Sequence, residues 1–447
     1  MHTLRHAFDS LSVRNFRLFF LGQLLSVTCT WMMVIAQDWL VLELSGNSGT
    51  ALGVVTALQF TPVLLLSLYG GRLADRHSKR RILVLANLAS GAFALVLGLW
   101  VLLGEIRLWH IWLFALALGT VNSVEAPARI ASVGEMVGNE LLPNASALSG
   151  AYFNAARVAG PAAAGLLIAR LDVGPVILIN ACSYLGAVAG LALMRPAELH
   201  GPPARPADPR VADGLRYVAR RPDLVLPLAL IGVLGLAGFN FQLTLPLLAK
   251  TGFRTGSAAF GLLSSSLAAG SLLAAFAASS RRARPTAAVV TGSALAFGAA
   301  EALTGLAPTL PTACLLLALT GFAMMYFAQA ANHRIQLGSD PAYRGRVMAL
   351  YMLIFQGTTP LGALLTGWLA DHWGPRWALS AGGLVSLAAT ATALAVTSAP
   401  GRKPAARRKP APGRKPAAPD DSAAPDDSAA RTARSGTGAQ DLRREES

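Results

Sequence analysis

The chain has 447 residues, of which 53% are hydrophobic and only 14% are charged. A soluble domain usually carries about 25% charged residues, so this composition excludes an ordinary globular surface. The formal net charge of +15 would suit a nucleic-acid-binding protein. The basic residues, however, lie in short breaks between apolar blocks, and this pattern indicates membrane topology with no nucleic-acid partner.

The apolar blocks are each about 20 residues long, enough for a helix to cross a hydrocarbon core of about 30 Å. Inside lipid every backbone polar group must be paired within the protein, and a barrel would show period-two alternation in its strands. We therefore predict an all-α membrane protein with twelve transmembrane helices. The predicted spans are residues 16–37, 50–71, 82–103, 109–132, 145–169, 174–194, 224–249, 258–280, 286–306, 309–332, 346–369 and 376–397.

The spans divide into two six-helix lobes, which we expect to be pseudo-symmetric. GPAAAGLLIARLDVGP (160–175) and GALLTGWLADHWGP (362–375) occupy equivalent places in the two lobes. Transporters with parallel repeats carry their substrate site between the halves. The predicted boundaries are a cytoplasmic N-terminus at 1–15, lobes at 16–194 and 224–397, a cytoplasmic linker at 195–223 and a cytoplasmic tail at 398–447.

The linker and the tail have distinct compositions. In the linker, Val211, Leu215 and Val218 share one helical face, which predicts a short amphipathic helix, either on the membrane surface or packed on the bundle. The tail repeats GRKPAA and APDDSA, and its basic, Pro/Ala-rich composition predicts disorder. Its basic residues would suit anionic lipid, or the tail is solvated with no specific role.

Lysine and arginine concentrate on one side of the predicted spans. The loops on the other side hold only Arg107, Arg170, Lys250, Arg254 and Arg376. The positive-inside rule then places both termini in the cytoplasm of a cell whose cytoplasmic membrane the chain crosses repeatedly. Tryptophans near the predicted outer ends would form an interfacial belt: Trp39, Trp100, Trp109, Trp112, Trp368, Trp373 and Trp377.

The most specific segment is GGRLADRHSKRR (70–81). It resembles the loop signature of the major facilitator superfamily, G-x-L-a-D-R-x-G-R-[RK]. Gly71, Leu73, Asp75, Arg76, Lys79 and Arg80 match, and Ser78 stands where the signature has glycine.

Further segments resemble the enterobactin-exporter-like group, the transmembrane secretion effectors. They are QDWLVLELSG (37–46), EAPAR (125–129), LPNA (142–145), NAARVAGP (154–161) and RGRV (344–347). This resemblance covers residues 14–397 and implies a two-lobed bundle that works by alternating access. It also implies export of siderophores, antibiotics or other amphiphiles.

Asp75 is the lone acid in the basic signature segment. An acid near a helix N-terminus is stabilised by the unpaired N–H groups and the helix dipole. The resemblance places this segment against the inner ends of spans 4 and 11. Glu125 and Arg129 stand four apart on span 4, where they would pair with the basic residues and Asp75. We expect a gate that holds the lobes together, with a plain positive-inside anchor as the alternative.

Ionisable groups inside a bilayer are costly and are functional candidates by default. Arg157 lies within span 5, where it binds an anionic part of the substrate or makes a structural pair, and Asn154 shares its face. Asp38 closes span 1 and is a candidate proton carrier or a solvated helix end. Glu301 in span 9 is the other proton candidate, or it makes a hydrogen bond between helices.

Other side chains in the spans would line a central cavity or pack between helices. The polar ones are Gln23, Gln59, Asn180, Asn240, Gln242, Gln329 and Gln356, and the aromatic ones are Phe60, Tyr152, Phe239 and Phe355. Cys29, Cys182 and Cys314 are scattered in apolar blocks and predict neither a disulfide framework nor a metal site. The chain contains no G-x-x-x-x-G-K-[ST], H-E-x-x-H or G-x-S-x-G motif, so we expect no enzyme and no cofactor.

These observations favour a monomeric secondary active transporter that exports a small organic molecule (a drug, siderophore or secondary metabolite) in exchange for protons. An importer or uniporter of the same fold is one alternative, because the loop signature does not encode direction. A membrane sensor or complex subunit that binds a ligand without moving it is the other.

Overall fold

The computed structural model describes residues 8–200, 211–279 and 283–398, and every regular element in these ranges is helical. We call α2 to α6 the first half and α8 to α14 the second half. The first half contains η1 (Asp9–Ser12), α2 (Arg14–Leu44), α3 (Gly49–Arg76), α4 (Lys79–Leu102), α5 (Leu108–Leu171) and α6 (Val173–Ala192).

The linker and second half follow. They contain η2 (Pro196–Glu198), α7 (Val211–Ala219), α8 (Pro222–Ala237), α9 (Phe241–Leu247), the π-helical turn η3 (Leu248–Gly252), α10 (Ser257–Ser279), α11 (Ala287–Gly305), α12 (Leu310–Gly338), α13 (Pro341–Trp373) and α14 (Pro375–Ser398). Residues 201–210 of the predicted linker, residues 399–447 of the predicted tail and residues 1–7 of the N-terminal segment lie outside the described residues.

Eleven elements among the described residues are long and apolar enough to cross a membrane. One of them, α5, has 64 residues and would be about 96 Å long if it were straight. Gly138 interrupts it with φ +71°, a backbone conformation that glycine adopts without steric cost. α5 therefore comprises two helices, and the prediction of an all-α protein with twelve apolar spans is confirmed.

Two predicted ends were placed too early. Asp38 was expected to close span 1, but α2 continues to Leu44 because Leu40, Val41 and Leu42 are buried and pack in the core. The signature segment was expected to be a loop, but α3 continues to Arg76, leaving only two residues before α4.

Span 7 is interrupted. α8 ends at Ala237, and Gly238, Phe239 and Asn240 separate it from α9. Two prolines, Pro227 and Pro246, also lie within this span, and proline lacks the N–H that a continuous helix requires. The interruption directs the Phe239 ring towards Phe297, with centroids 5.3 Å apart.

The linker helix α7 packs on the bundle. Val218 is buried, and the Tyr217 ring stacks on Tyr343 of α13 with centroids 4.5 Å apart. Leu215, expected on the same apolar face, is exposed. Of the two alternatives for this helix, the described residues support packing against α13.

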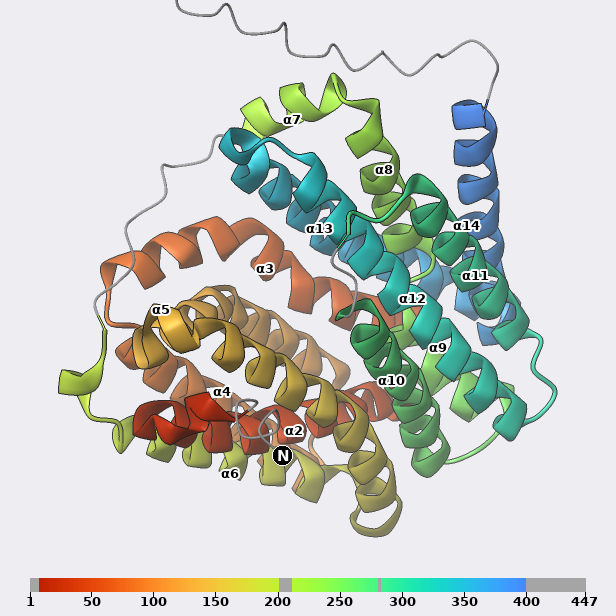
Figure 1. Cartoon of the computed structure of the whole chain (residues 1–447). Helices are drawn as coiled ribbons and strands as arrows, with labels where there is room; N and C mark the ends of the chain where they lie inside the picture. Colours follow the sequence, from red (N-terminus) through yellow and green to blue (C-terminus); the bar gives the residue numbers. More distant parts are fainter. Residues whose placement is uncertain (1–7, 201–210, 280–282, 399–447) are drawn as a thin grey trace, which may run out of the picture. The chain divides into compact units, whose positions relative to one another are not determined.

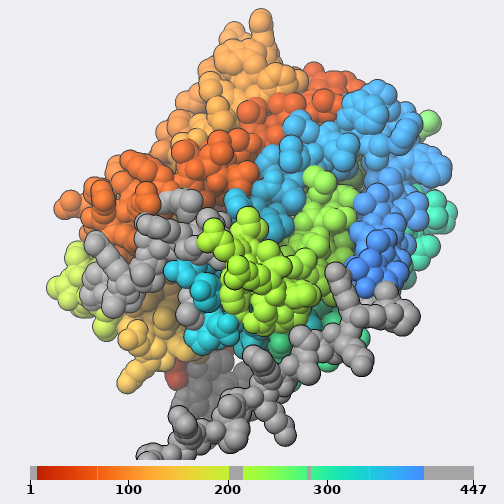
Figure 2. All heavy atoms as spheres, turned by 90° about the horizontal axis from the view of Figure 1, so that it is seen from above, coloured from red at the N-terminus to blue at the C-terminus, as the bar shows by residue number. Residues whose placement is uncertain are grey.

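The two halves contact each other mainly at one end. We call the end with Arg14, His77 and Ser398 the terminal end, and the opposite end the distal end. Figure 1 shows the red-to-yellow first half beside the green-to-blue second half. In Figure 2 the red-orange surface of the first helices borders the blue surface of α13 and α14.

The distal contact is close because small residues face each other. A Cβ on Gly53 would meet the Ala363 carbonyl oxygen at 2.7 Å, and a Cβ on Gly165 would meet that of Ser257 at 2.8 Å. The Ser265 hydroxyl donates to the Val158 carbonyl at 2.8 Å. These contacts join α3 to α13 and α5 to α10.

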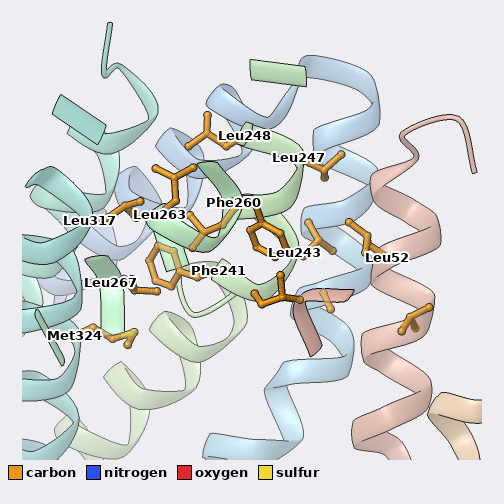
Figure 3. Packing of buried hydrophobic residues seen from close by; sticks show 14 of the residues in the cluster. Leu52, Phe241, Leu243, Leu247, Leu248, Phe260, Leu263, Leu267, Leu317 and Met324 are labelled. Carbon is orange, nitrogen blue, oxygen red and sulfur yellow. The ribbon is translucent and has the colours of Figure 1, made fainter. Parts of the chain in front are cut away.

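A hydrophobic cluster seals this region (Figure 3). Leu52 of α3 lies beside Leu243 and Leu247 of α9, next to the Phe241 and Phe260 rings. Trp39 was expected in the interfacial belt, but it is buried and stacks on Phe260 with centroids 6.4 Å apart. The distal ends of the halves therefore share one apolar core.

Candidate functional site

A cavity of about 470 Å³ lies between the two halves. Its wall is mostly apolar, and it receives side chains from α2, α3 and α5 on one side and from α9, α10, α12 and α13 on the other. The lining residues are Trp31, Val34, Ile35, Asp38, Phe60, Phe153, Arg157, Pro161, Phe239, Phe241, Gln242, Leu245, Phe260, Ser264, Leu267, Ala268, Met324, Met325, Ala328, Phe355, Gln356 and Thr359. Of the predicted lining residues, Phe60, Phe239, Gln242, Phe355 and Gln356 are present.

Asp38 is the one acid among the described residues that line this cavity. Its side chain is 2% exposed, and its buried Oδ2 atom has no hydrogen-bond partner in the described part of the chain. The continuation of α2 beyond it means that it is not a solvated helix end. A buried carboxylate without a partner is costly when it is ionised. The free-energy cost of ionising Asp38 therefore depends on whether water or a ligand in the cavity solvates the carboxylate.

Arg157 lines the same cavity from α5. Its Cζ atom lies 5.7 Å from the centroid of the Trp31 ring, a position that allows a cation–π interaction. Within the described ranges no carboxylate lies within ion-pair distance of Arg157, so the structural pair expected as one alternative is not formed there. Asn154 donates to the Gly150 carbonyl at 2.8 Å and does not line the cavity.

The aromatic wall is organised around the helix interruption. The Phe239 ring packs edge-on against three others, with centroids 5.3 Å from Phe297, 6.0 Å from Phe355 and 6.5 Å from Phe327. Met324 and Met325 complete this side. Aromatic and thioether side chains make an apolar surface that adapts to differently shaped ligands.

Glu301 lies outside the cavity lining. It is 2% exposed, and its Oε2 atom has no hydrogen-bond partner in the described residues. A Cβ on Gly238 would meet Oε2 at 2.8 Å, and a Cβ on Gly382 would meet Oε1 at 3.0 Å. The carboxyl group is therefore packed between α14 and the interruption after α8, outside the cavity lining.

The signature residues Lys79 and Arg80 make their contacts within the first half. The Lys79 ammonium lies 2.6 Å from the Glu135 carboxylate, and both side chains are largely buried. Arg80 donates to the Leu191 carbonyl at 2.7 Å and to the Ala192 carbonyl at 2.9 Å. These contacts fix the start of α4 against α5 and α6.

Among the described residues, Gly71, Asp75 and Arg76 do not make the contacts predicted for the gate. Asp75 and Arg76 are exposed, and neither makes an ion pair with the described residues. Glu125 and Arg129 pair with each other at 3.0 Å along α5. Nothing described lies within 4 Å of a Cβ built on Gly71. The expected inner gate is therefore not closed here.

The end of the linker is attached to the second half. Arg221 donates to the Asp223 carboxylate from Nε at 2.9 Å and to the Gly338 carbonyl at 3.0 Å, and Arg284 donates to Asp223 at 3.0 Å. The hydrogen bonds to the Asp223 carboxylate raise the pKa of the Arg221 guanidinium. These contacts join the starts of α8 and α11 to the end of α12.

Sequence reasoning missed several of these residues. Glu135 lies between the predicted spans 109–132 and 145–169, yet it belongs to α5 and is the partner of Lys79. Trp31 was not selected, although it stands seven residues before Asp38 and therefore on the same helical face. Asp371 was also missed. Its carboxylate accepts hydrogen bonds from the start of α3, and the Gly367-x-Leu-Ala-Asp371 pattern would have revealed it.

The arrangement defines a class of protein. Two bundles of apolar helices that enclose a central cavity are the architecture of a major facilitator transporter. The solved structure of a bacterial homologue of the human lysosomal transporter Spinster, in an inward-facing and occupied conformation, matches with a TM-score of 0.67. That match covers 86% of this chain and 96% of that one at 14% identity, so it shows the fold alone.

The family is defined by sequence. The model of the transmembrane secretion effector family matches residues 5–412, and the chain belongs to this family of the major facilitator superfamily. The chain is 26% identical over 358 residues to the multidrug efflux pump Tap of Mycolicibacterium fortuitum, covering 76% of this chain and 85% of that protein. Macrolide efflux protein A of Streptococcus pyogenes is 24% identical over 379 residues. The match covers 81% of this chain and 91% of that protein. The chain is a multi-pass membrane transporter and not an enzyme.

Proposed function

We propose that this transporter exports a small amphiphilic organic molecule in exchange for protons, across a cytoplasmic membrane with both termini in the cytoplasm. The observation that carries the proposal is the cavity of about 470 Å³, in whose apolar wall the described residues include one acid, Asp38, and one base, Arg157. The efflux functions in the names of the two relatives support export. The chain acts as a monomer in this proposal.

Alternating access is supported by where the halves touch. Their described hydrogen bonds lie near the distal end, whereas Leu65 and Tyr69 of α3 and Leu353 of α13 are exposed nearer the terminal end. This distribution fits a conformation closed on the distal side. With the termini in the cytoplasm, the state is inward-facing and ready to accept substrate from the cell.

Asp38 carries the proton in this proposal. Ionised, it would be a buried charge without a partner, which costs several kcal/mol, while the protonated group costs less. When the cavity opens to the distal side, water enters and a proton binds. When it opens to the terminal side, the arriving substrate displaces the proton. Alternate loading of one site by proton and substrate produces antiport.

Arg157 orients the substrate. Its guanidinium rests near the Trp31 ring and has donors available towards the cavity. A carboxylate, phenolate or carbonyl oxygen of the substrate would accept hydrogen bonds from it, and the phenylalanine and methionine wall would bind the apolar part. We infer that preferred substrates are aromatic amphiphiles with an acidic or strongly polar acceptor group.

The signature segment serves as the gate on the terminal side. α3 and α13 run antiparallel, with Gly53 opposite Ala363. Asp75 lies 22 residues after Gly53, and Pro341, the first residue of α13, lies 22 residues before Ala363. The first turn of α13 has no side-chain cap here. Closure of the terminal side would bring Asp75 to that turn, where the N–H groups favour an acid.

Purified protein in liposomes tests the function. A panel of fluorescent amphiphiles, including acidic and neutral members, is presented to vesicles with and without an imposed pH gradient. Gradient-driven accumulation of panel members by wild type, and not by empty vesicles, supports antiport. Substrate movement that does not depend on the pH gradient indicates a uniporter. Movement of substrate in the same direction as protons indicates an importer, and binding without movement indicates a sensor.

A further inference from the structure

Asp371 is a side chain of the second half that caps a helix of the first half. It lies near the end of α13, and its carboxylate accepts hydrogen bonds from the Thr50 N–H at 2.9 Å, from the Ser48 hydroxyl at 3.1 Å and from the Gly49 N–H. Ser48 is the N-cap residue of α3 and Gly49 its first residue. The acid therefore lies at the positive end of the α3 dipole.

The surrounding backbone allows this approach. A Cβ on Gly49 would meet the Gly367 carbonyl oxygen at 2.7 Å, and one on Gly53 would meet the Ala363 oxygen at 2.7 Å. The two helices therefore run antiparallel, so that a step of four residues forward along α3 matches a step of four residues back along α13. Asp371 lies four residues, about one turn, beyond Gly367, which places its carboxylate at the first turn of α3.

The segment around Asp371 repeats the signature segment at the other end of the same helix pair. Gly71-x-Leu-Ala-Asp75 ends α3, and Gly367-x-Leu-Ala-Asp371 ends α13. Each acid is followed five residues later by an arginine that donates to backbone carbonyls within its own half. Arg80 binds the carbonyls of Leu191 and Ala192 at the end of α6, and Arg376 binds that of Ala307, after α11.

We propose that Asp371 is the distal latch of the transport cycle, the counterpart of Asp75 at the terminal end, and that the two acids alternate. In this structure Asp371 is docked on α3, while Asp75 is exposed and the start of α13 lacks a side-chain cap. Opening the distal side separates α3 from α13 and breaks all three hydrogen bonds of Asp371. Closing the terminal side gives Asp75 the equivalent position on α13. The inference rests on the alternating access of the proposed function, but on neither its substrate nor its coupling ion.

The two latches bias one equilibrium in opposite directions. Neutralising Asp371 removes an interaction made only when the distal side is closed, and neutralising Asp75 removes one made only when it is open. A ligand or contact shifts a two-state equilibrium only by its difference between the states. The interaction of an acid with a helix N-terminus is strong enough to change that equilibrium constant by a factor of about 2 to about 30.

Distances between spin labels on the distal loops of the two halves measure the equilibrium directly. Glu105→Cys and Pro308→Cys carry the labels, with Cys29, Cys182 and Cys314 replaced by alanine, in lipid nanodiscs without substrate. Asp371→Asn should increase the population with the longer distance by about twofold to thirtyfold. Asp75→Asn should decrease it, and the double variant should lie between the two.

A matched control is Asp172→Asn. Asp172 is also an exposed acid at a distal helix start, but it caps α6 within its own half by accepting from the Val173 N–H at 2.7 Å, so its loss should leave the distances unchanged. An unchanged distribution in Asp371→Asn, or a shift in the same direction as Asp75→Asn, overturns the proposal. Monodisperse elution and an unaltered unfolding temperature show that each variant is folded. Because no transport is measured, failure of the export proposal leaves this result interpretable.

Discussion

Asp38 and Arg157 line the same cavity from α2 and α5 without forming an ion pair. Opposite charges in a low-dielectric site would attract strongly at contact distance, so their separation leaves each free to engage something else. In the proposed function, this separation would let one cavity accept both a proton and a polar group of a substrate. It also separates the two functions into residues that can be changed independently.

Asp38→Asn should uncouple transport. An amide at this position keeps the size of the side chain but cannot bind and release a proton, so accumulation driven by a pH gradient should fall to the level of empty liposomes. Exchange of labelled for unlabelled substrate across the membrane needs no net proton movement and should persist. The control Glu43→Gln changes an exposed acid on the same helix and should accumulate substrate normally. If Asp38→Asn lost exchange as well as accumulation, the acid would be assigned to substrate binding.

Arg157→Gln should weaken binding of acidic amphiphiles selectively. Losing a charge-assisted hydrogen bond costs about 1.5–3 kcal/mol, equivalent to about tenfold to hundredfold in Kd. Neutral members of a dye panel, held by the apolar wall, should change little. Quenching of the Trp31 fluorescence near the guanidinium provides a titration signal. Arg170→Gln, an exposed basic residue at the distal end of α5, is the control. Equal weakening for acidic and neutral dyes would indicate that Arg157 supports the cavity without recognising the substrate.

Lys79→Met should destabilise the protein because it leaves Glu135 buried without its partner. Breaking a buried pair from one side costs about 3–5 kcal/mol, whereas replacing both members by apolar side chains is often neutral. The double variant Lys79→Met with Glu135→Leu should therefore recover most of the unfolding temperature in detergent. An exposed pair provides the comparison: Arg195→Gln, which breaks the contact with Glu198, should change that temperature little. If the double variant were less stable than either single one, the pair would not be the source of the loss.

Glu301→Gln should retain proton-coupled transport. The side chain is buried between α14 and the interruption after α8 and does not line the cavity, so we expect that substrate does not contact it. The amide is nearly the same size as the acid and is uncharged. Gradient-driven uptake into liposomes, measured beside Asp38→Asn, distinguishes the two proton candidates. If only Glu301→Gln were uncoupled, the proton-binding residue would be Glu301 of the second half and not Asp38.

The helical spans could be predicted from the sequence because lipid leaves the backbone few alternatives. The ends of the spans could not, since they depend on tertiary packing. The charge of Asp38 suggests a helix end, yet α2 continues to Leu44 because the apolar residues after Asp38 are buried in the hydrophobic core. Periodicity within one helix does not reveal which neighbour will bury it.

The candidate site was predicted in part. The choice of Asp38 and Arg157 followed from the cost of charge in lipid, and both residues line the cavity. The same argument selected Glu301, which does not line it. The partners of Lys79 and Asp371 depend on contacts between segments 56 and more than 300 residues apart, which a single sequence does not specify. The repeated G-x-L-A-D pattern was the only signal of the second of these.

The most direct test of the central claim is the proton movement that accompanies the substrate. Wild-type protein is reconstituted in liposomes that contain a pH-sensitive dye, and substrate is added outside without any imposed gradient. Proton antiport predicts that substrate entry drives protons out, so the interior becomes alkaline, and that Asp38→Asn abolishes this change. Substrate entry with no change in interior pH, or with acidification, would contradict the account.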